Sequence, residues 1–319
     1  MPSARRRLPH VKHSRLWRGL AGARTASRPR RREQDTLPGL TLLPRTLLVA
    51  FLICSAAACG GSDHSPAAPS PSPISQLAGF TLNGDPTSAN GARWTYQATA
   101  AGVTYDLQGI LLRPAGSGSL PAVIISHGAT GNATGYSLLI ARTMVSWGLV
   151  CIATNYTHAS GVPIGAPGTA ADPGASVANV QRAHQLVEIL RSLGYVDMNR
   201  LALHGHSLGA FVTTAVAAAH PDLFRAASHT AGGIRPDFLD APAPSEAQIA
   251  TIRTPYQMHH GSDDFVVPLL ADQLFAAALA ARGVDHELLI YPGIDHVEVS
   301  ISTTVLDRIR QWYRGKGVL

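Results

Sequence analysis

Short apolar runs and amphipathic stretches alternate along most of the chain. Near the start of this pattern, the runs at 92–100 and 103–114 follow each other with no helical periodicity between them, which predicts an antiparallel pair of strands. Beyond them, strand-like runs alternate with stretches of helical periodicity. The predicted strands are 121–128, 149–156, 200–207, 224–232, 254–261 and 286–293, and the predicted helices are 134–147, 175–193, 208–219, 268–282 and 298–314.

The later strands are apolar throughout, and this predicts strands buried on both faces. Such strands are typical of a mostly parallel sheet with helices on both faces, so we expect an α/β fold with an antiparallel N-terminal start. The helix at 175–193 should pack one face on the sheet through Val177, Val180, Leu186, Val187 and Leu190. Two segments, 157–176 and 233–253, interrupt the alternation after strand ends, and we expect either walls of a ligand pocket or plain surface loops there.

The first 78 residues have a different composition. The apolar run "TLLVAFLICSAAA" (46–58) has 13 residues, which suits a signal peptide and is well short of the roughly 20 that cross a bilayer. Small residues lead to Cys59, as in a bacterial lipoprotein cleavage box; a plain signal peptide with Cys59 incidental is the alternative. We therefore predict a leader and signal peptide (1–58), a lipid-anchor cysteine with a Pro/Ser-rich tether (59–78) and a catalytic domain (79–319). The protein would be exported and anchored in the cell envelope, or else periplasmic or secreted.

The charge distribution argues against a nucleic-acid partner. The chain has a formal net charge of +6, but residues 1–46 hold 12 Arg and Lys against Glu33 and Asp35, so residues 47–319 carry a net charge of −4. A mildly acidic body lacks the basic patch that phosphate contacts require. We therefore expect membrane contact only through a lipid on Cys59.

The cysteine and histidine patterns predict neither a disulfide nor a metal site. Cys54 would leave with the leader and Cys59 would be acylated, so that Cys151 has no partner. The 14 histidines show no HExxH or finger spacing, and the adjacent His259 and His260 should point to opposite faces of a strand. We expect no cofactor.

The stretch "GHSLG" (205–209) places Ser207 between a predicted strand and a predicted helix. A G-x-S-x-G pattern is a weak signal alone, because in a chain this rich in Gly and Ser it arises by chance in roughly one such chain in five. At a sharp strand-to-helix turn, however, glycines two residues before and after a nucleophile remove a steric collision. The Leu208 N–H, at the helix N-terminus, would then face the negative charge that develops in acyl transfer.

Serine needs a base and an orienting carboxylate, and the sequence offers both at later strand ends. Asp263 and Asp264 follow the strand at 254–261, and His296 follows the strand at 286–293. The second oxyanion donor is expected directly after His127-Gly128, which makes it the N–H of Ala129. We interpret His127 as a residue that braces this loop.

From about residue 100 to 315 the chain resembles the α/β-hydrolases of the dienelactone hydrolase and prolyl-oligopeptidase-like branch. The segments that carry the resemblance are "LQGILLRP", "PAVIISHG", "RLALHGHSLGA", "HPDLFRAA", "HHGSDDFVVP" and "LLIYPGIDH". The resemblance implies an α/β-hydrolase fold and favours Asp264 over Asp263, because the family's acid lies three residues after the Gly of a strand-end His-Gly. It also implies His296 as the base, from the family's P-G-x-x-H ending.

Two departures from the family limit what the resemblance implies about substrate. Dienelactone hydrolase itself uses a cysteine where this chain has Ser207, and prolyl oligopeptidases carry a propeller domain for which this chain has no room. We therefore predict a serine hydrolase with the triad Ser207, Asp264 and His296 and oxyanion donors Ala129 and Leu208, acting on a small or polymeric carboxylic ester. A propeller-free serine peptidase and a non-catalytic binding lipoprotein are the alternatives. Phe238 or Ile249 could line an acyl pocket.

Overall fold

The computed structural model describes residues 77–160, 172–238 and 242–319. The predicted leader, the signal peptide, Cys59 and nearly all of the tether lie outside these residues. The strands of the sheet are β1 (Phe80–Asn83), β2 (Ala92–Ala100), β3 (Val103–Leu112), β4 (Leu120–Ser126), β5 (Val150–Thr154), β6 (Val196–His206), β7 (Ala226–Thr230), β8 (Tyr256–Gly261) and β9 (His286–Tyr291).

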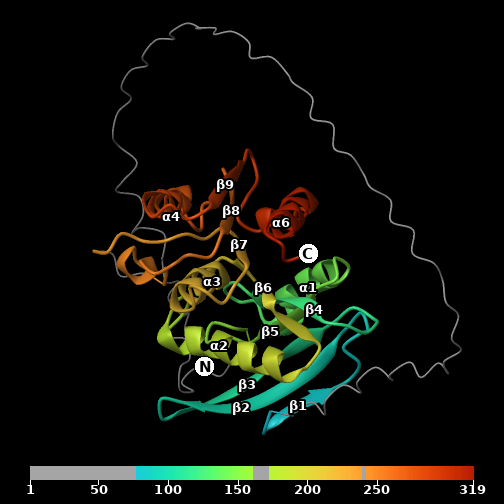
Figure 1. The fold of residues 1–319 in the computed structure, drawn as a ribbon. Coiled ribbons are helices and arrows are strands. Elements are labelled where there is room, and N and C mark those ends of the chain that lie inside the picture. Colours follow the sequence, from blue (N-terminus) through green and yellow to red (C-terminus); the bar gives the residue numbers. More distant parts are fainter. Residues whose placement is uncertain (1–76, 161–171, 239–241) are drawn as a thin grey trace, which may run out of the picture. The chain divides into compact units, whose positions relative to one another are not determined.

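The described strands form one mixed sheet in the order β1-β2-β3-β5-β4-β6-β7-β8-β9. β1, β2 and β3 pair antiparallel, and β3 also pairs antiparallel with β5, whereas the strands from β5 to β9 run parallel (Figure 1). The predicted parallel sheet with an antiparallel start is confirmed. The chain runs outward from β4 to β5 and then returns to place β6 on the other side of β4, which creates a switch point where ligands bind in open α/β sheets.

Helices cover both faces of the sheet, as predicted (Figure 1). One face carries α2 (Val177–Ser192), α3 (Leu208–Ala219) and α4 (Leu269–Ala281), and the other carries α1 (Leu138–Val145) and α6 (Thr303–Gly315). The apolar sequence of β4 is explained by its burial on both faces. Ile124 belongs to the core under α2 and α3, while Val123 and Ile125 belong to the core under α1 and α6. Alternate side chains thus enter opposite cores.

Some details of the structure differ from the sequence prediction. The edge strand β1 was not predicted, because it is short and largely exposed and so has no apolar run. The predicted last helix is broken at Ser302, whose backbone is extended, so that a short α5 (Glu298–Ile301) precedes α6. The expectation that Val177 packs on the sheet is wrong, since Val177 is the first residue of α2 and is 78% exposed, whereas Leu186, Val187 and Leu190 are buried.

None of the helices within the described ranges combines the length and the apolar character that a membrane crossing requires.

The predicted helix at 134–147 begins as a π-helical turn, η2 (Ala133–Ser137), and continues as α1. Of the two interrupting segments, residues 161–171 and 239–241 lie outside the described residues. The described part of the second includes a single 3-10 turn, η3 (Ala247–Ile249).

Candidate active site

Ser207 lies on a sharp turn between β6 and α3. Its backbone has φ 55° and ψ −122°, a left-handed conformation that costs free energy for any residue other than glycine. The flanking glycines make the turn possible. A Cβ on Gly205 would collide with the Gly209 carbonyl oxygen, and a Cβ on Gly209 would collide with the carbonyl oxygens of Ser126 and His127. The expectation that both glycines relieve a collision at this turn is confirmed.

His296 and Asp264 lie beside Ser207, as the positions of the strand ends predicted. Asp264 follows β8 and His296 follows β9. The Nδ1–H of His296 donates to Asp264 Oδ2 at 2.7 Å, which leaves Nε2 to accept a hydrogen bond from Ser207 Oγ at 3.0 Å. The three side chains thus form one hydrogen-bonded chain from carboxylate to hydroxyl.

The Asp264 carboxylate is fixed on its other oxygen as well. Oδ1 accepts the backbone N–H groups of Val266 at 2.8 Å and Val267 at 2.9 Å. Burial alone would raise the pKa of Asp264, but the hydrogen bond and charge of His296 and these two N–H groups outweigh it, and the pKa is lowered. The neighbouring Asp263 instead accepts a hydrogen bond from the Ser262 hydroxyl at 2.8 Å. Geometry therefore separates the two aspartates, and Asp264 is the one that orients His296.

The loop after β4 borders the serine. A Cβ added to Gly128 would lie 3.0 Å from Ser207 Cβ, which shows how closely the backbone of this loop approaches the hydroxyl-bearing carbon. Among the described residues, no hydrogen bond occupies the N–H of Ala129, and the N–H of Leu208 opens α3 and has no partner within its helix. Both predicted donors are therefore free to bind an anion, although their catalytic role stays a prediction.

His127 braces this loop, as we expected. Its Nδ1–H donates to the Gly128 carbonyl at 2.9 Å, and its Nε2 accepts the Tyr156 N–H at 3.1 Å. Burial and the nearby His158 lower the pKa of His127 to about 3, so the ring stays neutral and holds this tautomer. His158 in turn contacts the His127 carbonyl through Nε2 at 3.1 Å. No pattern in the sequence predicted this contact of His158, which lies 31 residues further along the chain.

His206, inside the G-x-S-x-G stretch, was not predicted to have a role. Its ring packs on that of His296, with 4.8 Å between centroids, and on Tyr136. Its Nδ1 lies 3.0 Å from Thr230 Oγ1. Burial and the neighbouring His296 and His204 lower the pKa of His206 to about 3. A neutral ring therefore covers one side of His296 and restricts its orientation.

Apolar side chains stand exposed beside this site. Phe265 and Val266 directly follow Asp264, and Val297 directly follows His296; Phe265 is 95% exposed. Phe238, one of the two residues expected in an acyl pocket, is also exposed. The other expectation is wrong: Ile249 is 0% exposed and belongs to the core with α3, so it faces the interior. A single sequence could not show which way the η3 turn faces.

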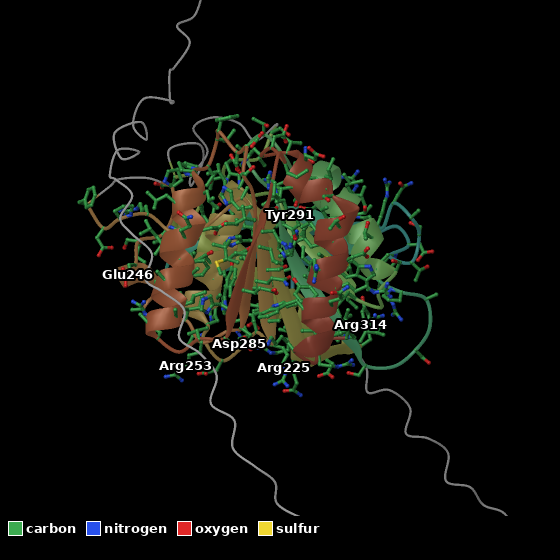
Figure 2. The ribbon with its side chains drawn as sticks, turned by 90° about the horizontal axis from the view of Figure 1, so that it is seen from above. Arg225, Glu246, Arg253, Asp285, Tyr291 and Arg314 are labelled. Carbon is green, nitrogen blue, oxygen red and sulfur yellow. The ribbon has the colours of Figure 1, made fainter. Side chains whose placement is uncertain are left out.

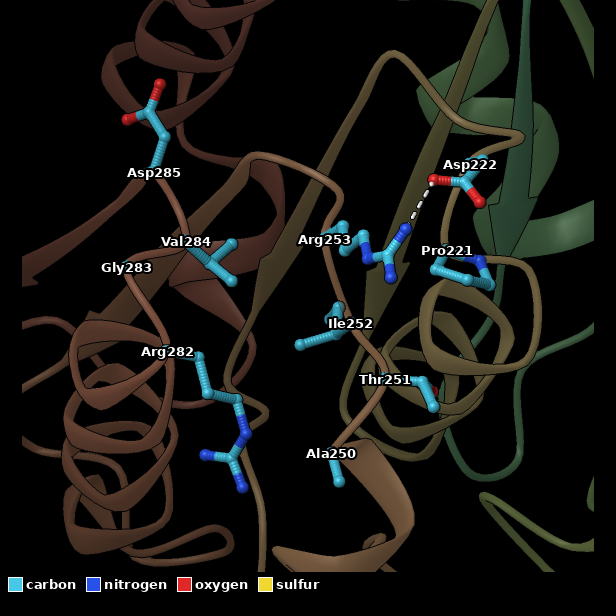
Figure 3. A pocket seen from close by; sticks show the side chains of 10 residues that line it. All are labelled: Pro221, Asp222, Ala250, Thr251, Ile252, Arg253, Arg282, Gly283, Val284 and Asp285. Carbon is cyan, nitrogen blue, oxygen red and sulfur yellow. Dashed lines mark hydrogen bonds and ion pairs between the residues drawn. The ribbon is translucent and has the colours of Figure 1, made fainter.

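A hollow of about 630 Å³ lies at the opposite end of the sheet from Ser207. Its walls come from the segments that precede β7, β8 and β9, whereas the triad side chains follow the ends of their strands. Figure 2 shows Asp285 and Tyr291 at the two ends of β9. In Figure 3 Arg253 reaches Asp222 across one side of the hollow, an exposed ion pair of 3.4 Å. This hollow does not contribute to the chemistry at Ser207.

Within the described residues no group of three or more His, Cys, Asp or Glu side chains is arranged to hold a metal ion. His259 and His260 do contact different partners, Tyr291 and Asp272. Cys151 is free and buried.

Comparisons with known proteins agree with this fold. No curated protein matches the chain. A candidate dipeptidyl aminopeptidase IV from Bacteroides ovatus has a solved structure that is 19% identical with a TM-score of 0.60, over 70% of this chain and 35% of that one. An esterase from Rhizomucor miehei is 14% identical with a TM-score of 0.54, over 70% and 82% of the two chains. An S-formylglutathione hydrolase from Agrobacterium tumefaciens is 17% identical with a TM-score of 0.55, over 74% and 98%.

The family model of dienelactone hydrolases matches residues 107–299, more than half of the chain. The matched range contains the turn at Ser207, Asp264 and His296, and the nine-stranded sheet has the architecture of an α/β-hydrolase. The solved esterase and peptidase structures share this fold, and the chain belongs to the dienelactone hydrolase family.

Proposed function

We propose that the protein is a serine carboxylic ester hydrolase that works through an acyl-enzyme on Ser207. The observation that carries the proposal is the hydrogen-bonded chain from Asp264 through His296 to Ser207, with distances of 2.7 and 3.0 Å, at a turn whose strained serine backbone both glycines support. A serine in an ordinary turn has no need of an imidazole that a buried carboxylate orients.

In the proposed reaction Ser207 Oγ attacks the ester carbonyl carbon while His296 Nε2 takes the hydroxyl proton. Asp264 keeps the Nδ1–H tautomer in place and stabilises the imidazolium that forms. The carbonyl oxygen becomes an oxyanion, for which we propose the N–H groups of Ala129 and Leu208 as donors. His296 then gives its proton to the alcohol oxygen as the carbon–oxygen bond breaks, which leaves the acyl group on Ser207.

Water completes the cycle. It attacks the acyl carbon as His296 accepts one of its protons, and the second tetrahedral species collapses with the proton returning to Ser207 Oγ. The carboxylic acid leaves and the resting hydrogen bonds form again. The proton transfers run between Ser207, His296 and Asp264, which already form one hydrogen-bonded chain, so that these transfers need no large rearrangement of the three side chains.

Two observations favour an ester over a peptide. The matches to the Rhizomucor esterase and to the Agrobacterium hydrolase cover 82% and 98% of those chains, whereas the match to the Bacteroides dipeptidyl aminopeptidase covers 35%. The exposed side chains beside the triad include the apolar Phe265, Val266 and Val297, which would contact an apolar acyl or alcohol group. We therefore propose esters with an apolar acyl or alcohol part as substrates.

Labelling with a fluorophosphonate probe tests the nucleophile. The wild-type protein should label and Ser207→Ala should not, because the probe phosphonylates only an activated serine. Ser192→Ala is the matched control. The Ser192 hydroxyl donates to the Ile189 carbonyl at the end of α2, away from the triad, so this variant should label like the wild type. Equal labelling of wild type and Ser207→Ala would remove Ser207 from the mechanism, and absence of labelling in the wild type would favour a binding protein.

Turnover of paired substrates separates esterase from peptidase. We expect p-nitrophenyl esters of short fatty acids to be hydrolysed at least 100-fold faster, in kcat/KM, than p-nitroanilides of peptides. Comparable kcat/KM values for the two would favour the peptidase alternative. A series of acyl chain lengths measured in the same assay would define the apolar part of the substrate.

A further inference from the structure

A second histidine lies beside the carboxylate that orients His296. His260, near the end of β8, places Nε2 3.5 Å from Asp264 Oδ2, the oxygen that binds His296. On its other side, His260 Nδ1 lies 2.7 Å from Oδ2 of Asp272, which belongs to the first turn of α4. His260 and Asp272 are both 0% exposed. A buried charged pair therefore stands directly behind the proposed catalytic acid.

The hydrogen bonds of His260 define its protonation state. Nε2 lies 3.0 Å from the Val267 carbonyl oxygen, which can only accept, so Nε2 carries a proton. Nδ1 faces the Asp272 carboxylate, which also accepts. With both ring nitrogens donating, His260 is an imidazolium. Burial alone would lower the pKa of His260, but the hydrogen bond and charge of Asp272 outweigh it and raise the pKa.

Asp272 has a second histidine partner that does not share this geometry. His229 Nε2 lies 2.6 Å from Asp272 Oδ1, and His229 Nδ1 lies 3.0 Å from the Tyr256 hydroxyl, which can donate to it. These two contacts occupy both ring nitrogens of His229. Within the part of the chain that the structure describes, His229 forms its ion pair with Asp272 and none with Asp264, so of these two histidines His260 is the one next to the triad.

We propose that His260, held as an imidazolium by Asp272, is a positioning residue for the triad, whose positive charge beside Asp264 lets His296 remain neutral and able to accept a proton at lower pH. The inference rests on the proposed function, since it assigns a second pair of residues to the same site. Asp264 would otherwise stabilise a protonated His296 in the resting enzyme, and an imidazolium on the same carboxylate oxygen opposes that protonation.

The remaining groups around the two histidines do not supply this charge. His296 faces Asp264, the Ser207 hydroxyl and the ring of His206, which burial keeps neutral. His260 faces two carboxylates: Asp264, which lies in the loop after β8, and Asp272, which belongs to α4. His229 of β7 contacts the other oxygen of Asp272. The side chain of His259 instead contacts Gln257 and Tyr291.

The test is the pH dependence of kcat/KM for ester hydrolysis, measured on the purified full chain. The acidic limb of this profile reports protonation of His296 in the free enzyme. We expect His260→Gln to move the limb to higher pH by about one unit, the size of shift that a neighbouring charge produces. Asp272→Asn should shift the limb in the same direction although Asp272 does not contact the triad, because a buried His260 without its counter-ion loses its proton.

His229→Gln is the matched control. It removes an equally buried partner of the same carboxylate but leaves the His260 imidazolium in place, so its limb should coincide with that of the wild type. If His260→Gln does not fold because Asp272 is left as an unpaired buried anion, the double variant His260→Gln/Asp272→Asn removes both charges together and should show the same shift.

The inference would be overturned if the acidic limb of the pH profile lay at the same pH in the wild type, Asp272→Asn and the double variant. It would also be overturned if His229→Gln shifted the limb as far as His260→Gln does. These outcomes are distinct from failure of the proposed function, which would appear as ester hydrolysis by Ser207→Ala. If Ser207→Ala is inactive and the limbs coincide, Ser207 remains the nucleophile and His260 is structural only.

Discussion

Replacing Gly209 with alanine should damage the active site through a single methyl group. Gly209 is the second residue of α3, and its Cα faces the backbone at the end of β4. The added Cβ would lie 2.5 Å from the His127 carbonyl oxygen and 2.5 Å from the Ser126 carbonyl carbon. Ordinary contacts begin near 3.4 Å, so the start of α3 must withdraw by about 1 Å. The obstacle is backbone, which cannot rotate away as a side chain can.

This displacement should reduce activity more than stability. Overpacking of this kind costs about 1–3 kcal/mol, which for a domain of this size lowers Tm by roughly 2–12 °C. Ser207 is joined directly to the displaced residues, and its 3.0 Å hydrogen bond to His296 would lengthen. A misplacement of about 1 Å costs on the order of 100-fold in rate, so we expect kcat/KM for a p-nitrophenyl ester to fall about 100-fold.

Gly315→Ala is the matched control for this measurement. Gly315 is a helical glycine in α6 with no atom within 4 Å of its added Cβ, so alanine should leave activity unchanged and should leave stability equal or slightly higher. Thermal melts and ester kinetics on the two variants and the wild type complete the experiment. If Gly209→Ala hydrolyses the ester within threefold of the wild-type rate, the close approach of α3 to β4 does not position Ser207, and the reasoning fails.

The remaining predictions concern acid stability and the leader. Burial lowers the pKa of His127, His204 and His206 to about 3, whereas a histidine in the unfolded chain has a pKa near 6.5. Between these values the unfolded chain binds protons that the folded chain does not, so the free energy of unfolding is highest above pH 6.5 and falls as the pH falls. Each of the three histidines should lower the free energy of unfolding by up to about 1.4 kcal/mol per pH unit below about pH 6. Thermal melts should show Tm falling steeply from pH 6.5 to 5, less steeply in His204→Gln, and a flat profile would contradict this. We also propose export with a lipid on Cys59: cells fed labelled palmitate should label the wild-type protein and not Cys59→Ala, and equal labelling would exclude this anchor.

The positions of the strands, and the burial of the later strands on both faces, could be predicted from the sequence because runs of apolar residues indicate buried segments. β2 has the bounds that were expected, and the helix after Ser207 begins and ends as predicted. The pattern could not show features that depend on exposed or local geometry. β1 is an exposed edge, and the break at Ser302 is a change of one backbone angle within an amphipathic stretch.

The candidate site could be predicted in part, because parallel strands bring their ends to one edge of the sheet. Ser207, Asp264 and His296 follow three different strands, and their side chains do meet in one hydrogen-bonded chain. Their catalytic roles, and those of Ala129 and Leu208, stay predictions.

The pair behind the site was missed. Asp272 is one carboxylate in the apolar sequence "LLADQLFAAALAA" of α4, and a buried acid on such a helix is a signal that a partner must lie opposite. Which histidine supplies that partner depends on the packing of α4 against β7 and β8, and the chain has 14 histidines. Sequence reasoning therefore identified the residues that follow strand ends and not those that support them.

The central claim is that Ser207 carries the acyl group during turnover. The most direct measurement is to mix the protein with p-nitrophenyl acetate, quench within one turnover, digest, and locate the acetyl group by mass spectrometry. We predict acetyl on the peptide that contains Ser207 in the wild type and no acetyl on that peptide in Ser207→Ala, together with loss of turnover. Acetyl found on another residue of a protein that still turns over, or full turnover by Ser207→Ala, would contradict the account.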